Sequence, residues 1–320
     1  MVTQIKEIIK NWNIRQDLSI REIDESDGVH YLGHIWFLGD SYVLKRHNIE
    51  DHDKLIRDFH ILKALENLNF TSAPLYTNDG EIFFECHNDN VIYTLSKYVP
   101  GKTLTEKEIQ SENMPAYGFK IGQAIAKLHL ALAAIENRMS VVDAEMYKTV
   151  IEWAIPKTRD LNMEFNLEIQ ESIFDDYIKT FGKLYDKLPK QLIHRDSHPG
   201  NIIFNNGEVT GFIDFVVDER NVRLRDVCYC LTGLGGDFFG NPEKWFDIIR
   251  ETLNGYNSVC PLTDEEKQSV FYIMCSIQFI CVAYFAGNDK FKQAWEQNRK
   301  LAPFVVKHKD QIMNIGNEIK

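Results

Sequence analysis

The segment LIHRDSHPGNIIF, at residues 192–204, constrains the fold of this chain more than any other part of its sequence. Two apolar runs enclose two charged residues, two histidines, a Pro-Gly pair and an asparagine. A buried charge is costly unless it is paired or binds a metal, so these polar residues need a specific structural or chemical reason. We therefore predict a turn between two buried segments, with Asp196 and Asn201 close together on it.

A second acidic residue follows at the end of a predicted hairpin. In the stretch IIFNNGEVTGFIDF, the pair Asn206-Gly207 is a typical two-residue hairpin turn. Asp214 then lies at the end of the second strand. Two carboxylates and an amide oxygen are ligands that suit Mg²⁺, and one carboxylate remains to meet a hydroxyl. Phosphoryl transfer needs little beyond such a set of groups.

Each of these polar residues has an ordinary structural role when it is taken alone. An aspartate or asparagine at a turn more often caps the turn than binds a ligand. His194 could be a core histidine, and Arg195 could pair with a buried acid. The spacing H-R-D-x-x-x-x-N, followed by I-D-F after a hairpin, is a much rarer combination. The combination therefore indicates a phosphoryl-transfer site.

The sequence changes character near residue 98. Before it, alternating apolar and polar residues predict strand pairs around Gly39-Asp40 and around Asn88-Asp89-Asn90. Between these pairs, DHDKLIRDFHILKALENL has apolar residues every three or four positions, which predicts one helix. Helical patterns dominate beyond residue 98. We predict an α+β protein of two lobes, with an antiparallel sheet and one main helix in residues 1–98 and a larger, mainly helical lobe in residues 99–320.

The segment HRDSHPGN, with GFIDF downstream, resembles the catalytic and metal-binding segments of the protein-kinase-like bilobal fold. More specifically, H-x-D-x-H-P-x-N followed by I-D-F resembles the aminoglycoside phosphotransferase and choline kinase-like family, which includes type II homoserine kinases. The resemblance runs from about residue 20 to beyond residue 230. It implies that Asp196 is the catalytic base and that Asn201 and Asp214 bind Mg²⁺.

The resemblance also implies structural roles around these residues. The pair Arg225-Asp226 in RLRDVCYC matches an acidic position that follows the metal-binding loop in this family, and it would anchor that loop. Four further residues would shape the catalytic loop and hold its turn: His194, Arg195, His198 and Pro199.

The N-terminal part supplies the cation that the resemblance requires. Lys45, in YVLK, is expected to contact the α- and β-phosphates of ATP, although a lysine at a strand end is by itself usually a solvated charge. The family places an acidic partner for this lysine on the following helix. Asp58 stands there in place of the usual glutamate, and Glu66 on the same helix is a weaker candidate.

The nucleotide-binding loop is less distinct. A glycine-rich loop should precede the second strand, but SDGVHYLGHIWFLGD offers only Gly28 and Gly33. The segment YTLSKYVPGKTL resembles the family's hinge. The resemblance implies that adenine lies against this hinge and bonds to backbone groups of residues 96–99, which include Ser96 and Tyr98.

The predicted function is that of an ATP-dependent kinase with a small-molecule acceptor. Phe215, Val216 and Val217 follow Asp214, and no A-P-E activation segment comes after them, so the part that binds peptides in protein kinases is missing. The acceptor hydroxyl would belong to an aminoglycoside-like antibiotic, homoserine, choline or a similar amino-alcohol. Two alternatives are a protein serine/threonine kinase of the same fold and a non-catalytic nucleotide-binding protein. The second is disfavoured because the predicted catalytic and metal-binding residues are all present.

The acceptor itself stays open at this stage. Several acidic residues of the C-terminal lobe could hold an amine-bearing acceptor, or they could be solvated surface. They are Asp218, Glu219, Asp237 and Asp264.

Composition excludes some classes of function. The 47 acidic residues outnumber the 36 basic ones, which gives a net charge of −11 and argues against non-specific nucleic-acid binding. The six cysteines form no CxxC pair and several of them lie in apolar runs, which predicts buried free thiols in a reducing cytosol. The longest apolar stretch, residues 271–286, contains Ser276 and Gln278 and predicts a core helix. We expect a cytoplasmic protein without membrane partners and leave its oligomeric state open.

Overall fold

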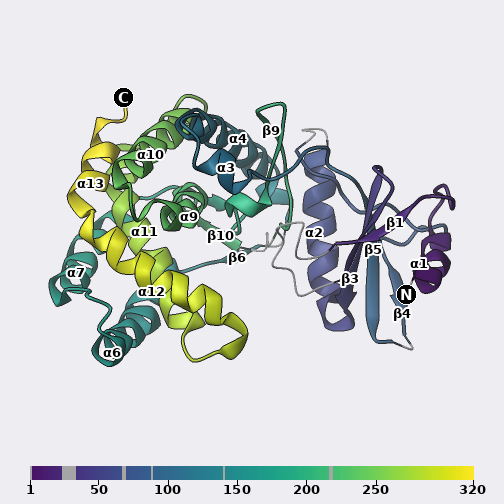
Figure 1. The fold of residues 1–320 in the computed structure, drawn as a ribbon, viewed down its shortest axis with the longest axis horizontal. Coiled ribbons are helices and arrows are strands. Elements are labelled where there is room, and N and C mark those ends of the chain that lie inside the picture. The colour runs from purple at the N-terminus through teal and green to yellow at the C-terminus, as the bar shows by residue number, and fades with distance from the viewer. Residues whose placement is uncertain (1, 24–33, 67–69, 88, 140, 216–218) are drawn as a thin grey trace.

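The computed structural model describes residues 2–23, 34–66, 70–87, 89–139, 141–215 and 219–320. Its N-terminal part is a five-stranded sheet with one long helix, and its C-terminal part is mainly helical (Figure 1). The predicted α+β class is therefore confirmed. A lobe boundary at residue 98 stays a prediction.

The N-terminal sheet has the strand order β1-β2-β3-β5-β4, and each neighbouring pair is antiparallel. The strands are β1 (Ile20–Glu22), β2 (Ile35–Leu38), β3 (Tyr42–Asn48), β4 (Phe84–Cys86) and β5 (Val91–Lys97). The two predicted strand pairs, β2–β3 and β4–β5, are confirmed. One face of the sheet packs on α1 (Val2–Ile8) and the short turn after it, through a core that includes Trp12 and Trp36.

The predicted helix before β4 is α2, His52–Leu65. Phe59 and Leu65 are buried, as their spacing predicts. Ile61 and Leu65 belong to the same hydrophobic core as the C-terminal helices. Helix α2 therefore links the sheet to the helical part, and it lies between them in Figure 1.

In the C-terminal part, the described residues form eleven helices and two small sheets. Its longer helices are α4 (Met114–Ile135), α6 (Ile155–Phe165), α9 (Leu224–Gly235), α10 (Pro242–Asn257), α11 (Asp264–Phe285), α12 (Lys292–Lys307) and α13 (Lys309–Glu318). Its shorter helices are α3 (Glu106–Ile109), α5 (Met146–Thr149), α7 (Glu171–Asp176) and α8 (Gly182–Tyr185). Its strands are β6 (Val142–Asp143), β7 (Lys190–Leu192), β8 (Ile202–Asn205), β9 (Glu208–Phe212) and β10 (Glu219–Val222).

The two small sheets position the polar segment of the sequence. Strands β6, β10 and β7 form one sheet, and β8 and β9 form the predicted hairpin. Its turn residues Asn206 and Gly207 both have positive φ, at 50° and 75°, as a type I′ turn requires. The segment between β7 and β8 holds Asp196 and Asn201, and Asp214 follows β9.

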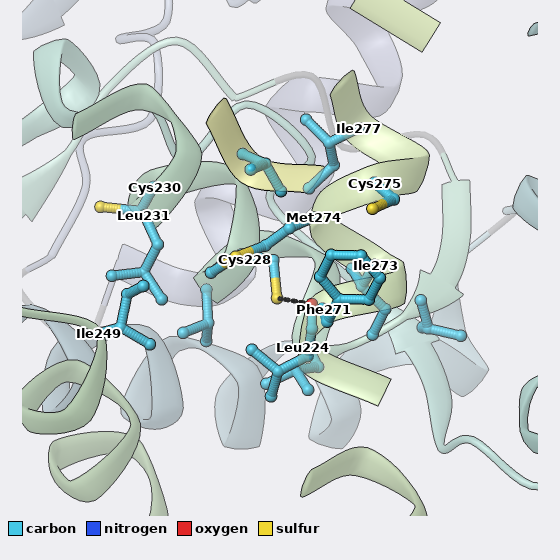
Figure 2. Close-up of a cluster of buried hydrophobic side chains, with 14 of the residues drawn as sticks. Leu224, Cys228, Cys230, Leu231, Ile249, Phe271, Ile273, Met274, Cys275 and Ile277 are labelled. Carbon is cyan, nitrogen blue, oxygen red and sulfur yellow. Dashed lines mark hydrogen bonds between the residues drawn. The ribbon is translucent and has the colours of Figure 1, made fainter. Parts of the chain in front are cut away.

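Helix α11 is the predicted core helix. Within the described chain, α11 alone is long and apolar enough to cross a membrane, but 72% of its apolar window is buried inside the protein. Figure 2 shows its residues Phe271 and Met274 in the same buried cluster as Leu224 and Leu231 of α9. Thr263 caps its start and forms a reciprocal capping box with Glu266. The prediction of a buried core helix is confirmed.

No disulfide joins the described cysteines, and four of the six are buried: Cys228, Cys230, Cys260 and Cys275. The Cys228 thiol donates to the carbonyl of Val270 at 3.7 Å, between α9 and α11 (Figure 2). Cys86 and Cys281 are partly exposed, so the prediction of burial holds for the thiols inside the helical core.

Helices α4 and α10 approach each other closely because glycines lie at their contact. A Cβ atom added at Gly255 would lie 2.0 Å from the carbonyl oxygen of Phe119, and one added at Gly122 would lie 2.0 Å from that of Thr252. We expect Gly255→Ala to lower the free energy of unfolding by about 1–3 kcal/mol, because the backbones must separate. Urea denaturation measures this loss. Gly240→Ala is the control, since no atom lies within 4 Å of its added Cβ, and equal losses in both variants would contradict the close packing.

Candidate active site

The loop after β7 is held by the fully buried carboxylate of Asp226, in the first turn of α9. Its Oδ2 accepts the backbone N–H of His194 at 2.7 Å, and its Oδ1 accepts that of Arg195 at 2.9 Å. The backbone carbonyl of Asp226 also accepts the hydroxyl of Ser197 at 2.6 Å. These bonds tie the residues on both sides of Asp196 to α9. Asp226 therefore anchors the catalytic loop, whereas the resemblance implied an anchor for the metal-binding loop.

Two residues of this region have a strained backbone. Arg195 has a φ of 71° and Asp214 a φ of 54°, in the left-handed region that non-glycine residues rarely adopt. Such residues persist only where the surrounding contacts hold them, and they cluster at functional sites. Asp226 supplies such a contact by binding the N–H of Arg195. The backbone is therefore held at the residue that directly precedes Asp196.

His194 connects this loop to the segment before Asp214. Its Nε2 bonds to the carbonyl of Ile213 at 3.1 Å, and its Nδ1 accepts the N–H of Asp196 at 3.2 Å. Only a neutral imidazole can donate from one nitrogen and accept at the other. Burial lowers the pKa of His194 and keeps the ring in that form. His194 therefore has the loop-shaping role that the resemblance implied.

The carboxylate of Asp196 is oriented by the amide of Asn201. Asn201 Nδ2 donates to Oδ2 of Asp196 at 3.0 Å and to its backbone carbonyl at 2.9 Å. The backbone of Asn201 also pairs with the hairpin, because Ile213 N–H donates to its carbonyl at 3.0 Å. The structure therefore brings Asp196 and Asn201 together, as the sequence predicted. Since the NH₂ group faces Asp196, the amide oxygen of Asn201 points to another side.

Lys45 reaches from β3 to the C-terminal part, where its ammonium donates to Oδ1 of Asp214. Burial alone would raise the pKa of the Asp214 carboxyl, but the charge and hydrogen bond of Lys45 lower it below its ordinary value. Asp214 is thus ionised at neutral pH. Burial, followed by the charge of Lys45, lowers the pKa of nearby His47 to about 4, so this imidazole is uncharged there.

Asn201 and Asp214 fit a divalent cation that also binds a substrate. Each offers an oxygen, Oδ1 of Asn201 and the second carboxylate oxygen of Asp214, outside the bonds described above. Within the part of the chain that the structure describes, no group of three or more His, Cys, Asp or Glu side chains could hold a metal. Mg²⁺ usually takes one or two protein ligands and completes its shell with water and substrate phosphates. The donor set suits that mode of binding.

For the other predicted nucleotide-binding residues, the described contacts do not test the predicted role. Asp58 is buried on α2, and its pairing with Lys45 stays a prediction. Glu66 accepts the ammonium of Lys63 at 2.7 Å on the surface of the same helix. Gly33, together with Gly28, lies outside the described residues.

The hinge uses two of its backbone N–H groups within the protein. Lys97 N–H donates to the hydroxyl of Ser72 at 3.1 Å, and Tyr98 N–H donates to the carbonyl of Ser41 at 2.8 Å. Ser96 lies at the end of β5, opposite Val43. The Tyr98 hydroxyl donates to the Gly101 carbonyl at 2.8 Å and holds the backbone directly after the hinge. A contact of Ser96 or Tyr98 with adenine stays a prediction. Adenine would bond to hinge backbone groups other than the N–H groups of Lys97 and Tyr98.

The acidic candidates for acceptor binding have different surroundings. Glu219 forms an ion pair with Arg195 at 3.4 Å. Burial, followed by the charge of Glu106, raises the pKa of Asp237. Asp264 is exposed in the first turn of α11, and Asp218 lies outside the described residues.

The sequence did not reveal the buried side chains that bond to Asp226. His129, on α4, bonds to Oδ2 of Asp226 at 3.0 Å and to the hydroxyl of Tyr256 at 2.9 Å. All three side chains come from different helices, and His129 and Asp226 are fully buried. A single histidine within the apolar helix KLHLALAA was the available signal, because a buried imidazole needs polar partners.

Comparison with known proteins agrees with this fold. The sequence model of the phosphotransferase enzyme family matches residues 31–239. A homoserine kinase of Mesorhizobium japonicum is 29% identical over 190 residues, which cover 58% of this chain and 56% of the relative. A homoserine kinase of Gluconobacter oxydans is 23% identical over 179 residues, which cover 55% and 53%. The chain thus spans about half the length of the curated relatives it matches.

Solved structures resemble the chain over nearly its whole length. An amicoumacin kinase in complex with AMP-PNP, Ca²⁺ and Ami has a TM-score of 0.66 at 12% identity, with 95% of this chain and 93% of that one covered. A microcompartment-associated aminopropanol kinase has a TM-score of 0.65 at 13% identity, with both chains fully covered, at 100%. A GDP complex of an aminoglycoside 2′-phosphotransferase has a TM-score of 0.65 at 13% identity, with 94% and 98% covered. These likenesses confirm the predicted protein-kinase-like bilobal fold.

Proposed function

The chain belongs to the phosphotransferase enzyme family, and from this membership and its site we propose that it is an ATP-dependent kinase of small-molecule hydroxyls. One observation carries the proposal. The Asp196 carboxylate is fixed by Asn201, which directly precedes the hairpin that leads to the Lys45–Asp214 ion pair. A positioned base, two oxygen ligands and a lysine are the groups that phosphoryl transfer requires.

In the proposed reaction the acceptor oxygen forms a bond to the γ-phosphorus of ATP. The bond from that phosphorus to the oxygen bridging the β-phosphate breaks, and its electron pair leaves with ADP. The hydroxyl proton passes to the carboxylate of Asp196. Asn201 holds Oδ2 of Asp196 at 3.0 Å, so the carboxylate is oriented before the acceptor arrives. This fixed orientation reduces the reorganisation that the reaction needs.

The nucleotide would lie on the side of Lys45. Its ammonium, already held by Asp214, would pair with phosphate oxygens and favour the leaving ADP. Asn201 and Asp214 would hold Mg²⁺, which when bound neutralises charge on the phosphates. Asp58 would help to position Lys45 from α2, and Gly33, Ser96 and Tyr98 would border the nucleotide.

The proposed acceptor is an amino-alcohol or a hydroxy amino acid. The curated relatives are homoserine kinases, and similar structures are those of kinases of aminopropanol, amicoumacin and aminoglycosides. All of these substrates contain an amino group and a hydroxyl. We also propose that the protein acts in the cytoplasm, where ATP is available.

An acceptor panel tests the proposal. ADP release is measured with Mg²⁺ and ATP in the presence of L-homoserine, choline, 1-amino-2-propanol, an aminoglycoside, a simple sugar or a generic protein substrate. We expect one class of small alcohols to raise ADP release, and Lys45→Met to lower it by roughly 10²–10³-fold, because a charge that stabilises the transition state is lost.

Binding of the nucleotide provides the second measurement. Mg²⁺-ATP should raise the melting temperature of the wild type, because a ligand that binds only the native state stabilises it by mass action. Absence of this shift would favour a non-catalytic protein. Phosphorylation of the protein substrate alone would favour the protein-kinase alternative.

A further inference from the structure

Arg225 lies near Asp196 but has no role in the proposed phosphoryl transfer. It is partly exposed in the first turn of α9, and its Nη1 donates to the backbone carbonyl of Arg195 at 2.6 Å. Its guanidinium lies over the ring of Tyr229, 5.3 Å from the ring centroid. Among the described residues, none places a carboxylate within ion-pair distance of it. An arginine has five N–H donors, so most of its hydrogen-bonding capacity remains.

The neighbouring arginine shows that this position is unusual. Arg223 forms two hydrogen bonds with the carboxylate of Glu266, both at 2.7 Å, and a third bond to the carbonyl of Pro261. The chain has a net charge of −11, so carboxylates are in excess. A partly buried guanidinium beside so many available acids usually finds one of them. The carboxylate that Arg225 lacks can be supplied by a ligand.

Arg225 lies next to the proposed base. The carbonyl that it binds belongs to Arg195, which directly precedes Asp196. Tyr229 lies one turn further along α9, and burial, followed by the charge of Asp196, raises the pKa of its phenol. From α11, the thiol of Cys281 has its pKa raised by burial to about 11, with smaller opposing effects of Arg225 and Asp196. Arg225 thus lies beside the loop that carries Asp196, and the charge of Asp196 acts on both Tyr229 of α9 and Cys281 of α11.

The in-line geometry of phosphoryl transfer indicates the side from which the acceptor is expected. The nucleotide side of Asp196 is built from Lys45 on β3 and from Asn201 and Asp214, which flank the β8–β9 hairpin. The attacking and leaving oxygens of a phosphoryl transfer lie roughly in line, on opposite sides of the phosphorus. The acceptor would therefore approach from the side that these residues do not occupy, and Arg225 belongs to α9, which is not among their elements.

We propose that Arg225 binds a carboxylate of the acceptor, and that the acceptor is therefore a hydroxy acid, such as a hydroxy amino acid, rather than a purely cationic alcohol. The planar guanidinium can bind a carboxylate through two parallel hydrogen bonds, and stacking on Tyr229 holds its plane in place. The inference rests on the proposed kinase function and adds a specificity-determining residue to it. A single guanidinium matches the single charge of a carboxylate.

Matched pairs of acceptors test this inference. Each pair consists of a hydroxy amino acid and the same molecule without its carboxylate: L-homoserine with 3-amino-1-propanol, L-threonine with 1-amino-2-propanol, and L-serine with ethanolamine. The readout is the ratio of kcat/KM for the acid to kcat/KM for its partner. We expect the wild type to prefer the acid of at least one pair, and Arg225→Met to lower that ratio by roughly 10- to 100-fold.

The ratio separates recognition from a structural role. If Arg225 only supported the loop through its bond to Arg195, the variant would slow both acceptors alike and leave the ratio unchanged, which would overturn the inference. Arg225→Lys should restore part of the ratio, because it keeps the charge without the planar fork. Arg250→Met, which removes a charge from a surface pair with Asp247, is the control and should keep the wild-type ratio.

Failure of the inference differs from failure of the kinase proposal. A wild type that phosphorylates the amino-alcohols as well as the acids, or better, overturns the role of Arg225 and leaves the kinase proposal intact. A wild type that phosphorylates no alcohol of the wider panel overturns both.

Discussion

Replacement of Asp196 by asparagine is expected to lower kcat by about 10²–10⁴-fold, the range that a positioned general base contributes. The asparagine can keep an oxygen where Asn201 donates to Oδ2 of Asp196 at 3.0 Å, but it cannot take the acceptor proton. Asp196 is only partly buried, so the fold should be retained. Steady-state kinetics with the preferred acceptor, together with the melting temperature of the variant, measure both effects.

Nucleotide binding is the control for this variant. Mg²⁺-ATP should raise the melting temperature of Asp196→Asn as it raises that of the wild type, because Lys45, Asn201 and Asp214 are unchanged. A variant with kcat within tenfold of the wild type would show that Asp196 is not the base. Loss of the ATP-induced shift would assign Asp196 to nucleotide binding instead.

Replacement of Asp226 by alanine is expected to have the largest effect on stability, a loss of about 3–5 kcal/mol in the free energy of unfolding. The carboxylate accepts the N–H groups of His194 and Arg195 and bonds to His129. Removing it leaves these groups unpaired in the protein interior, where each unpaired group is costly. It also removes a contact that holds Arg195 at a positive φ of 71°. Urea denaturation, with the midpoint and slope compared to the wild type, measures the loss.

An exposed aspartate is the matched control. Asp186→Ala removes a carboxylate at the C-cap of α8, and we expect a change within about 0.5 kcal/mol. Asp226→Asn should lie between the two, since its amide keeps one acceptor oxygen. If Asp226→Ala and Asp186→Ala were equally stable, the anchoring role of Asp226 would be contradicted.

Local patterns predicted the parts of the fold that local chemistry determines. The turn at Asn206-Gly207 requires positive φ at both positions, and asparagine and glycine adopt it readily. These two residues alone therefore predict the hairpin. Helix α2 followed from the spacing of its apolar residues, and Phe59 and Leu65 are buried as expected. The close approach of Asp196 and Asn201 is also local, because both lie on one short loop.

Local patterns do not predict contacts between segments that are distant in the sequence. Lys45 and Asp214 meet across 169 positions, and His129 and Asp226 across 97, through the packing of separate elements. The family resemblance supplied Lys45 and Asp214 as candidates but paired Lys45 with an acid on α2. No local pattern indicates that Arg225 lies over Tyr229 beside Asp196, since that depends on how α9 meets the loop.

Mass spectrometry of the acceptor after incubation with ATP and Mg²⁺ tests the proposed phosphoryl transfer most directly. With the wild type, we predict that the acceptor gains one phosphoryl group for each ADP formed, and that Asp196→Asn produces neither at a comparable rate. Formation of ADP and free phosphate with every acceptor of the panel unmodified, or modification of the acceptor by Asp196→Asn at the wild-type rate, would contradict it.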